Sequence, residues 1–300
     1  MAQPIIGIVA AIASPVLWGF APIYFKYLVN YPLMQVMAQR ALWAGILFVL
    51  VVFLVRGWGR VRRLLKQKRE MQILMFCAIL VGLNWSAYLY AVFTDRIAQS
   101  ALGYFIYPLL VIAMGVVVLK ERFGRRSQIA LMLAFIGVVI KASVLGDIPW
   151  LALFIGITFA VYATIRKQMQ GTDALTGVVI EMFLLAPIAL FYISYLVSHG
   201  EPFFFDGGLA AVLFAISSGF VTATPLLLFH IGNRYLPLTL TGFLFYINPS
   251  MQLASAVWLY GEPLGITSTL AFGFIWAALI VQFMRLPLRK SQGDRRTKKW

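Results

Sequence analysis

Long apolar stretches alternate with short polar ones along almost the whole chain of 300 residues. Ten of these stretches approach or exceed the roughly 20 residues that a helix needs to cross a bilayer. They cover residues 4–28, 33–55, 71–93, 99–119, 127–145, 150–166, 176–197, 208–231, 238–260 and 268–288. Their apolar runs are unbroken, whereas the strands of membrane barrels alternate apolar and polar residues. The pattern therefore predicts an all-α integral membrane protein with ten transmembrane helices, since helices satisfy their own backbone groups in lipid.

The composition supports this class and excludes several others. Hydrophobic residues make up 62% of the chain and charged residues 12%, against about 25% charged residues in a soluble globular domain. One cysteine, Cys77, rules out an internal disulfide or a cysteine metal cluster. No charged residue precedes Lys26, so we expect the first apolar stretch to stay in the membrane instead of acting as a cleaved signal peptide. No metal, cofactor or catalytic residue set is expected.

The positive charges fall mainly on one side of the predicted membrane. Of the 25 lysine and arginine residues, 21 lie in one alternating set of loops and the C-terminal end: within 56–69, 120–126, 166–167, at 234 and within 285–299. The positive-inside rule places these segments in the cytoplasm. Ten spans then put both termini in the cytoplasm. The net charge of +15 is thus read as a topology signal and a lipid headgroup contact, and nucleic acid is not expected as a partner.

A shift of 141 residues superimposes the two halves of the chain. It brings Pro108 onto Pro249, Glu121 onto Glu262 and Lys26 onto Lys167, and it also aligns most span boundaries. We therefore expect a five-helix repeat over residues 1–145, a second over 146–288 and a basic cytoplasmic tail over 289–300. Because five spans are an odd number, the second repeat is inverted. Inverted repeats are typical of secondary transporters, which bind substrate near the bilayer midplane where the repeats meet.

Two ionisable residues lie inside predicted spans. Arg40 in the second span and Glu181 in the seventh are related by the same shift of 141. We expect them to be bridged by water, another polar residue or substrate; a structural ion pair or snorkelling to the interface is the alternative. Glu181 is the only carboxylate well inside a span and is the candidate for proton coupling. His230 is a weaker candidate, expected near the interface.

Aromatic and amide residues deep in the spans predict an aromatic-lined cavity with few charges, suited to planar or weakly polar solutes. Helix packing is the alternative explanation for each one. The candidate substrate-binding residues are Trp18, Gln39, Arg40, Trp43, Asn84, Trp85, Tyr88, Tyr104, Tyr107, Tyr162, Phe243, Tyr246 and Asn248.

Several of these motifs resemble one transporter family. The segments 18–26, 84–85, 100–109, 120–123, 224–227 and 274–276 are similar to the RarD branch of the EamA-type transporters, in the drug/metabolite transporter superfamily. The resemblance implies two inverted five-helix repeats in the inner membrane. It also implies a role in chloramphenicol resistance, with relatives that export amino acids, aromatic compounds or other metabolites. Gln39 and Phe245 depart from the family, which often has His and Gln there.

We therefore expect a secondary active exporter of small organic metabolites or amphenicol-type drugs that works by alternating access, with proton coupling left open. A facilitative carrier or channel-like permease for amino acids or aromatic metabolites is the alternative, and an integral-membrane transferase is a remote one. The chain has no phosphate-binding loop of the type G-x-x-x-x-G-K-[ST] for ATP. The expected partners are a small organic solute and the lipid bilayer, and the oligomeric state is left between monomer and weak dimer.

Overall fold

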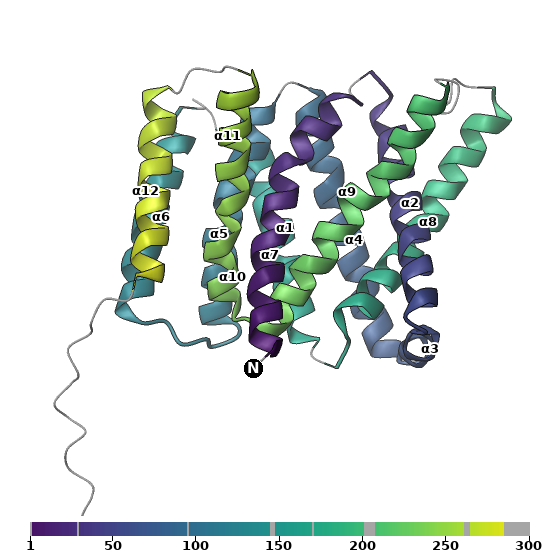
Figure 1. Ribbon diagram of the computed structural model, residues 1–300, viewed down its shortest axis with the longest axis horizontal. Helices are drawn as coiled ribbons and strands as arrows, with labels where there is room; N and C mark the ends of the chain where they lie inside the picture. The colour runs from purple at the N-terminus through teal and green to yellow at the C-terminus, as the bar shows by residue number, and fades with distance from the viewer. Residues whose placement is uncertain are drawn as a thin grey trace, which may run out of the picture.

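The computed structural model describes residues 2–28, 30–94, 96–144, 148–169, 171–200, 208–260 and 265–284. Within these ranges all regular elements are α-helices, which confirms the all-α class (Figure 1). Three predictions fall outside the described residues: the tail at 289–300, the boundary between 145 and 146, and the match of Glu262 to Glu121.

Twelve helices lie in the described part of the chain. They are α1 (Ala2–Lys26), α2 (Leu33–Leu54), α3 (Trp58–Leu65), α4 (Lys68–Phe93), α5 (Ile97–Val117), α6 (Arg125–Ala142), α7 (Trp150–Gln168), α8 (Ala174–Ser198), α9 (Gly208–Tyr235), α10 (Leu238–Phe245), α11 (Ile247–Tyr260) and α12 (Ile266–Phe283). Each predicted apolar stretch coincides with one helix, except that the ninth is divided into α10 and α11.

Eight helices are long and apolar enough to cross a membrane: α1, α2, α4, α5, α7, α8, α9 and α12. Many large apolar side chains point outward from these helices, including Phe191 at 75% exposure and Phe53 at 67%. A soluble monomer rarely exposes apolar surface on this scale. The chain is therefore a multi-pass membrane protein.

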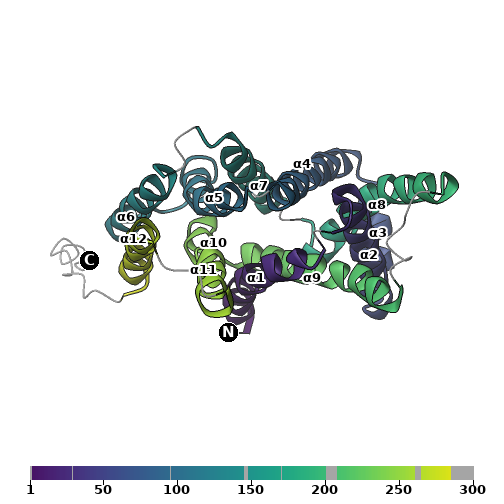
Figure 2. The same cartoon turned by 90° about the horizontal axis from the view of Figure 1, so that it is seen from above.

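The helices form two facing rows (Figure 2). One row contains α6, α5, α7 and α4, and the other contains α12, α10 with α11, α1 and α9. Across the rows α6 packs on α12 and α5 on α10, while α2 packs on α8 at the far end. Each row mixes helices from the two halves of the chain, so the interface between the halves runs through the whole bundle.

Small residues let some helices approach closely, as is common in membrane proteins. At the crossing of α5 and α7, a Cβ on Gly103 would lie 2.8 Å from the Ile155 side chain. A Cβ on Gly156 would lie 3.0 Å from Ile106. These two glycines therefore fix the contact between a helix of the first half and a helix of the second.

The short helix α10 begins at a carboxylate from the other half of the chain. Oε1 of Glu121 accepts a hydrogen bond from the Leu238 backbone N–H at 2.7 Å, and Oε2 accepts one from Thr239 at 2.8 Å. These backbone groups have no partner within the helix, and the helix dipole favours a negative charge there. Glu121 therefore ties the loop before α6 to the start of α10.

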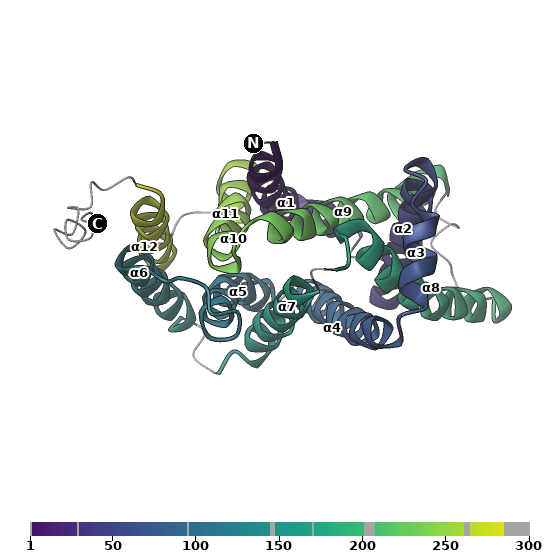
Figure 3. The same ribbon diagram turned by 90° about the horizontal axis from the view of Figure 1, so that it is seen from below.

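The sequence prediction treated residues 56–70 as a loop, whereas they contain α3, an amphipathic helix at the lower face (Figure 3). Val61 and Leu64 are buried. Trp58 stacks on Phe183 of α8 with a ring distance of 6.3 Å. The search for long apolar stretches did not predict this helix, because it is only eight residues long and rich in arginine. Its form is that of a helix lying along a membrane surface.

Candidate functional site

Six of the predicted substrate-binding residues line one cavity, which we call the chamber. They come from α1, α2, α4 and α5, and they are Trp18, Arg40, Asn84, Trp85, Tyr88 and Tyr104. Its volume is about 20 Å³, room for about one water molecule. In this conformation the chamber is therefore closed around its own side chains.

Arg40 enters the chamber from α2 and is 3% exposed. Its Nε donates a hydrogen bond to Oγ1 of Thr222 at 2.8 Å. The guanidinium carbon lies 4.4 Å from the ring centre of Trp85 and 5.0 Å from that of Phe25. These distances are those of cation–π contacts. The charge is thus held by two aromatic faces and one hydroxyl.

Asn84 is partly committed to helix packing. Its Nδ2 donates to the carbonyl of Ile155 at 2.8 Å and lies 3.0 Å from Oγ1 of Thr158. Both partners lie on α7, so this amide joins α4 to α7. Its side chain therefore lines the chamber and also fixes one of the chamber's walls.

Next to the chamber, whose lining includes Trp18 and Phe159, five aromatic side chains form a cluster that we call the plug: Trp18, Tyr107, Phe159, Phe229 and Phe245. Phe159 is central, with ring distances of 4.8 Å to Tyr107, 5.0 Å to Phe229 and 5.6 Å to Trp18. The Tyr107 ring lies 4.6 Å from Phe245. Among the described residues no hydrogen-bond partner reaches the buried Tyr107 hydroxyl. The plug closes the chamber on this side.

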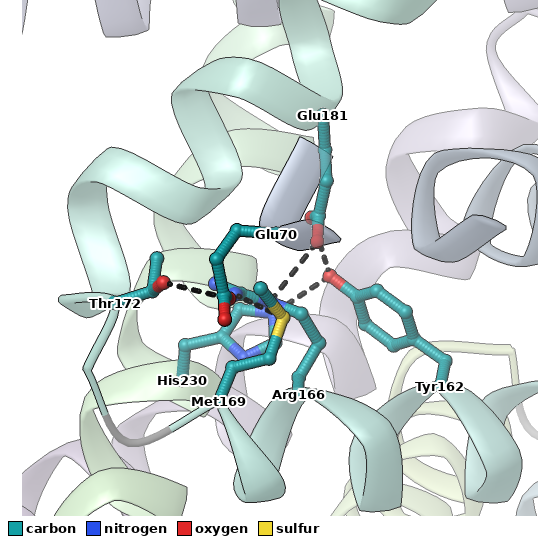
Figure 4. Close-up of polar contacts among 7 residues, drawn as sticks. All are labelled: Glu70, Tyr162, Arg166, Met169, Thr172, Glu181 and His230. Carbon is teal, nitrogen blue, oxygen red and sulfur yellow. Dashed lines mark hydrogen bonds and ion pairs between the residues drawn. The ribbon is translucent and has the colours of Figure 1, made fainter. Parts of the chain in front are cut away.

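Beyond the plug lies a buried polar cluster around Glu181 (Figure 4). Glu181 Oε1 lies 3.0 Å from Nε of Arg166, and both side chains are almost fully buried. Tyr162 donates a hydrogen bond to Oε2 of Glu181 at 2.8 Å. The same hydroxyl lies 2.6 Å from Nε2 of His230. A carboxylate, a guanidinium, a phenol and an imidazole from α7, α8 and α9 therefore form one connected network.

The structure corrects two sequence predictions here. Arg166 was assigned to a cytoplasmic loop, but it lies in the last turn of α7 and points into the bundle. Arg40 and Glu181 were expected to be bridged, but each has its own partners: Thr222 for Arg40 and Arg166 for Glu181. The second correction follows from the first, because Arg166 supplies the counter-ion of Glu181.

A glycine makes the Arg166–Glu181 pair fit. Gly177 lies one turn before Glu181 on α8, and a Cβ at this position would overlap the guanidinium of Arg166. Any larger residue would displace the arginine. Gly177 was not among the predicted site residues, since nothing in the sequence indicates which side chain crosses above it.

The polar network borders a second cavity of about 320 Å³, which we call the vestibule. It is lined by Arg166, Lys167, His230, Asn233 and Arg234, together with residues of the 169–174 segment and Tyr235. The volume falls within the range of small-molecule sites. Because Arg234 and Tyr235 are exposed, the vestibule opens at the face where α7 ends, and the chamber lies on the other side of the plug.

Two further polar residues of the vestibule, Lys167 and Asn233, are bound differently. Lys167 donates to the backbone carbonyls of Asn233 and Leu236, at the C-terminal end of α9. The Asn233 side chain is 3% exposed, and in the described part of the chain neither its nitrogen nor its oxygen has a hydrogen-bond partner. Asn233 therefore leaves both a donor and an acceptor free beside the cavity.

The remaining predicted residues lie outside the chamber. Gln39 accepts a hydrogen bond from the Trp43 indole at 2.9 Å. Phe243 and Tyr246 are fully buried between helices, where the Tyr246 hydroxyl lies 3.4 Å from the carbonyl of Phe105. Asn248 lies 3.5 Å from the Pro15 carbonyl. In this conformation these residues contact neighbouring side chains and helices, and their role in substrate binding stays a prediction.

Arg166, Asn233 and Thr222 were absent from the predicted set, and His230 was placed at the interface although it is 5% exposed. One signal for Arg166 was available in the sequence: Tyr162 and Arg166 are four residues apart, so they share a helix face.

No group of three or more His, Cys, Asp or Glu side chains that could hold a metal occurs among the described residues.

Comparison with known proteins places these features in a family. Residues 5–142 match the model of the EamA-like transporter family. The chain is 34% identical to protein RarD of Salmonella typhimurium and 33% identical to protein RarD of Escherichia coli, each over 93% of this chain and 94% of the relative. It is 27% identical to the chloramphenicol-sensitive protein RarD of Pseudomonas aeruginosa, over 92% of both chains.

A solved crystal structure of a protein has the same fold. Its TM-score is 0.71, and the match covers 94% of this chain and 98% of the other at 16% identity. At this identity the likeness concerns the fold alone.

Proposed function

Because the chain belongs to the RarD branch of the EamA-like transporter family, we propose that it exports small organic solutes across the bacterial inner membrane by alternating access. It is a membrane transporter and not an enzyme. The observation that carries the proposal is the pair of cavities on opposite sides of the plug. The chamber holds Arg40 and the vestibule holds Arg166, and aromatic rings close the path between them.

The proposal includes ten spans arranged as two inverted five-helix repeats. Adding 141 to the first residues of α2, α5 and α6 gives the first residues of α8, α10 and α12. The pairs that pack across the rows, α2 on α8, α5 on α10 and α6 on α12, are the pairs that the shift relates. This arrangement is expected if a two-fold axis in the membrane plane relates the halves. The spans beyond the eight long apolar helices are then α6 and the combined α10 and α11.

Two hydrogen bonds support the same relationship. Ser14 donates to the Pro225 carbonyl at 2.8 Å, which joins α1 to α9. Asn84 donates to the Ile155 carbonyl at 2.8 Å, which joins α4 to α7. The shift of 141 carries Ser14 onto Ile155 and Asn84 onto Pro225. Each half therefore makes the same contact, with donor and acceptor exchanged.

We further propose that the vestibule faces the cytoplasm. It opens on the side of α3 and of the arginine-rich segment before α4, which are the segments that the positive-inside rule assigns to the cytoplasm. The first residues of α1 lie at the same face in Figure 1. In this conformation a solute could reach the plug from the inside, while the chamber beyond it stays closed.

Glu181 is the proposed site of proton coupling. Protonation of its carboxylate would remove the charge that holds Arg166, and Arg166 lines the vestibule. A proton would thereby alter the contacts of α7 with α8, two helices that border the path. Intramembrane ionisable residues of this kind are commonly part of transport mechanisms.

Counterflow in liposomes tests the transport function. Labelled chloramphenicol is the first solute, chosen because one relative is described as chloramphenicol-sensitive. Unlabelled solute on the far side should accelerate its movement, and Trp85→Ala should slow that exchange at least tenfold. Trp150→Ala, an exposed tryptophan, is the matched control and should leave it unchanged. Flux without acceleration by solute on the far side would point to an open pore and contradict the proposal.

The coupling role has a separate readout. In Glu181→Gln the side chain keeps an oxygen that can accept from Tyr162, so the fold and solute exchange should survive. A pH gradient should no longer drive net flux in this variant. If the gradient drives Glu181→Gln as it drives the parent protein, Glu181 is not the coupling residue.

A further inference from the structure

Arg40 has no counter-ion in the described part of the chain. Its guanidinium is buried against Phe25 and Trp85 and bonded to Thr222. Its Nη1 is buried without a hydrogen-bond partner among the described residues. Among the described residues that line the chamber, none is a carboxylate. Glu181, the carboxylate expected to serve it, is bound to Arg166 instead.

A buried charge in this state is costly. Aromatic faces attract a cation, but they do not neutralise it, and a guanidinium has five N–H donors to satisfy. Proteins normally pair such a charge with an anion. In a transporter, the chamber that holds the unpaired cation is also the place where the solute binds.

The vestibule provides a second, independent observation. Four of its lining residues are Arg166, Lys167, Arg234 and His230, and none of the described residues that line it is acidic. Asn233 adds a buried amide whose nitrogen lacks a partner among the described residues. The path toward the plug therefore offers several hydrogen-bond donors and the cations Lys167 and Arg234, while Arg166 is paired with Glu181.

Building on the proposed function, we propose that the transported solute is a small organic anion whose carboxylate group binds the free Nη1 edge of Arg40. The guanidinium is planar and matches a carboxylate with two parallel hydrogen bonds. Trp85, Tyr88 and Tyr104 surround the same space and would hold the apolar part of the solute. The chamber must widen to admit it, which is the change that alternating access requires.

The chemistry fits a dissolved carboxylate better than a lipid headgroup. The chamber shares Ala21 and Val221 with a groove of about 350 Å³ between α1 and α9. That groove is lined mainly by apolar residues, such as Leu17 and Phe220. A phosphate group would have to cross this apolar wall, whereas the vestibule offers donors along its length.

Benzoate and benzamide test the proposal, because they share ring and size and differ in charge. Full-length protein in phosphatidylcholine nanodiscs is titrated with each compound while the unfolding temperature is followed, since a ligand of the folded state raises it. Benzoate should raise the unfolding temperature, and benzamide should bind at least tenfold more weakly. Equal effects of the two compounds, or none from benzoate, would overturn the proposal.

Arg40→Met separates binding from folding. Removing an uncompensated buried charge should leave the unfolding temperature of the free protein unchanged or higher, while the benzoate effect falls at least tenfold. A structural arginine would behave in the opposite way, with a large loss of stability, and that result would contradict the inference. Arg63→Met on the exposed face of α3 is the matched control and should bind benzoate like the parent.

Two further arms identify the source of the anion. If phosphatidylglycerol in the nanodiscs abolishes the benzoate effect through Arg40, the site belongs to a lipid headgroup and the proposal fails. If chloride alone gives the same stabilisation, the site is a halide site and it also fails. These binding measurements need no transport. Benzoate binding without counterflow of labelled benzoate would contradict the proposed function and leave the anion site standing.

Discussion

Arg166 and Glu181 keep their charges inside the helix bundle because each is the counter-ion of the other. Removing one partner of such a buried pair commonly costs about 3–5 kcal/mol, since the other is left uncompensated. The pair depends on a third residue without a side chain, Gly177, which leaves space for the guanidinium. At the scale of single residues, the polar network therefore depends on the space left by Gly177 as much as on the two charges.

Gly177→Ala should break this network. The added methyl group would push Arg166 away from Glu181, and such overpacking typically costs about 1–3 kcal/mol. Thermal unfolding of the purified variant should show the loss, together with weaker pH-driven flux. Gly273→Ala, also inside a helix but with nothing within 4 Å, is the control. It should stabilise the protein by up to about 1 kcal/mol, because alanine favours helix. Equal behaviour of the two variants would refute the role of Gly177.

Among the elements, α10 receives its N-terminal cap from a distant segment. It has eight residues and starts after Pro237, without a side-chain cap of its own. Glu121 supplies the missing acceptors from the loop between α5 and α6. The cap therefore couples the position of α6 to that of α10 and, through it, to the wall of the plug at Phe245.

Substitution of Glu121 should weaken α10 in steps. Glu121→Gln keeps one oxygen acceptor and should lose less stability than Glu121→Ala, which removes both. Loss of a helix cap costs about 0.5–2 kcal/mol. Hydrogen exchange at the backbone amides of Leu238 and Thr239 is the direct measurement, and it should accelerate in the same order. Unchanged exchange in Glu121→Ala would show that water or another group caps α10 equally well.

At the scale of the whole molecule, the proposed inverted topology predicts which loops are accessible from outside the cell. Cys77 is the only cysteine and is buried, so a Cys77→Ser background is free of reactive thiols. In this background Ser143→Cys, after α6, should react with a membrane-impermeant maleimide added to intact cells. Arg63→Cys, on α3, should react only after the membrane is opened. The reverse pattern would place α3 outside and overturn the proposed orientation.

Much of this architecture could be predicted from the sequence, because lipid imposes it. All ten apolar stretches coincide with helices, since a backbone in hydrocarbon has no other way to pair its groups. Six chamber residues were also predicted, from aromatic and amide side chains inside spans. The partners of the charges could not be predicted. Arg166 stands at a span end, where a cation normally faces water, and only the folded structure brings this end of α7 to Glu181 on α8.

The segment 56–70 and the ninth span show a second limit. The helix α3 is too short and too cationic for a hydropathy window, and its apolar face appears only when Trp58, Val61 and Leu64 are placed on a helix. The division between α10 and α11 follows from tertiary contacts, among them the cap from Glu121, which lies 117 residues away from Leu238 in the chain.

The shift of 141 that relates Arg40 to Glu181 also relates Phe25 to Arg166. In the first half Arg40 rests on the ring of Phe25, and in the second half Arg166 faces Glu181. In the proposed repeat, one contact between neighbouring helices has thus become two contacts of different kinds. Protonation can break the contact that contains the Glu181 carboxylate, but it leaves the contact of Arg40 with the Phe25 ring unchanged. We therefore expect the two contacts to respond to different signals. A change of pH would act only through the Arg166–Glu181 contact beside the vestibule.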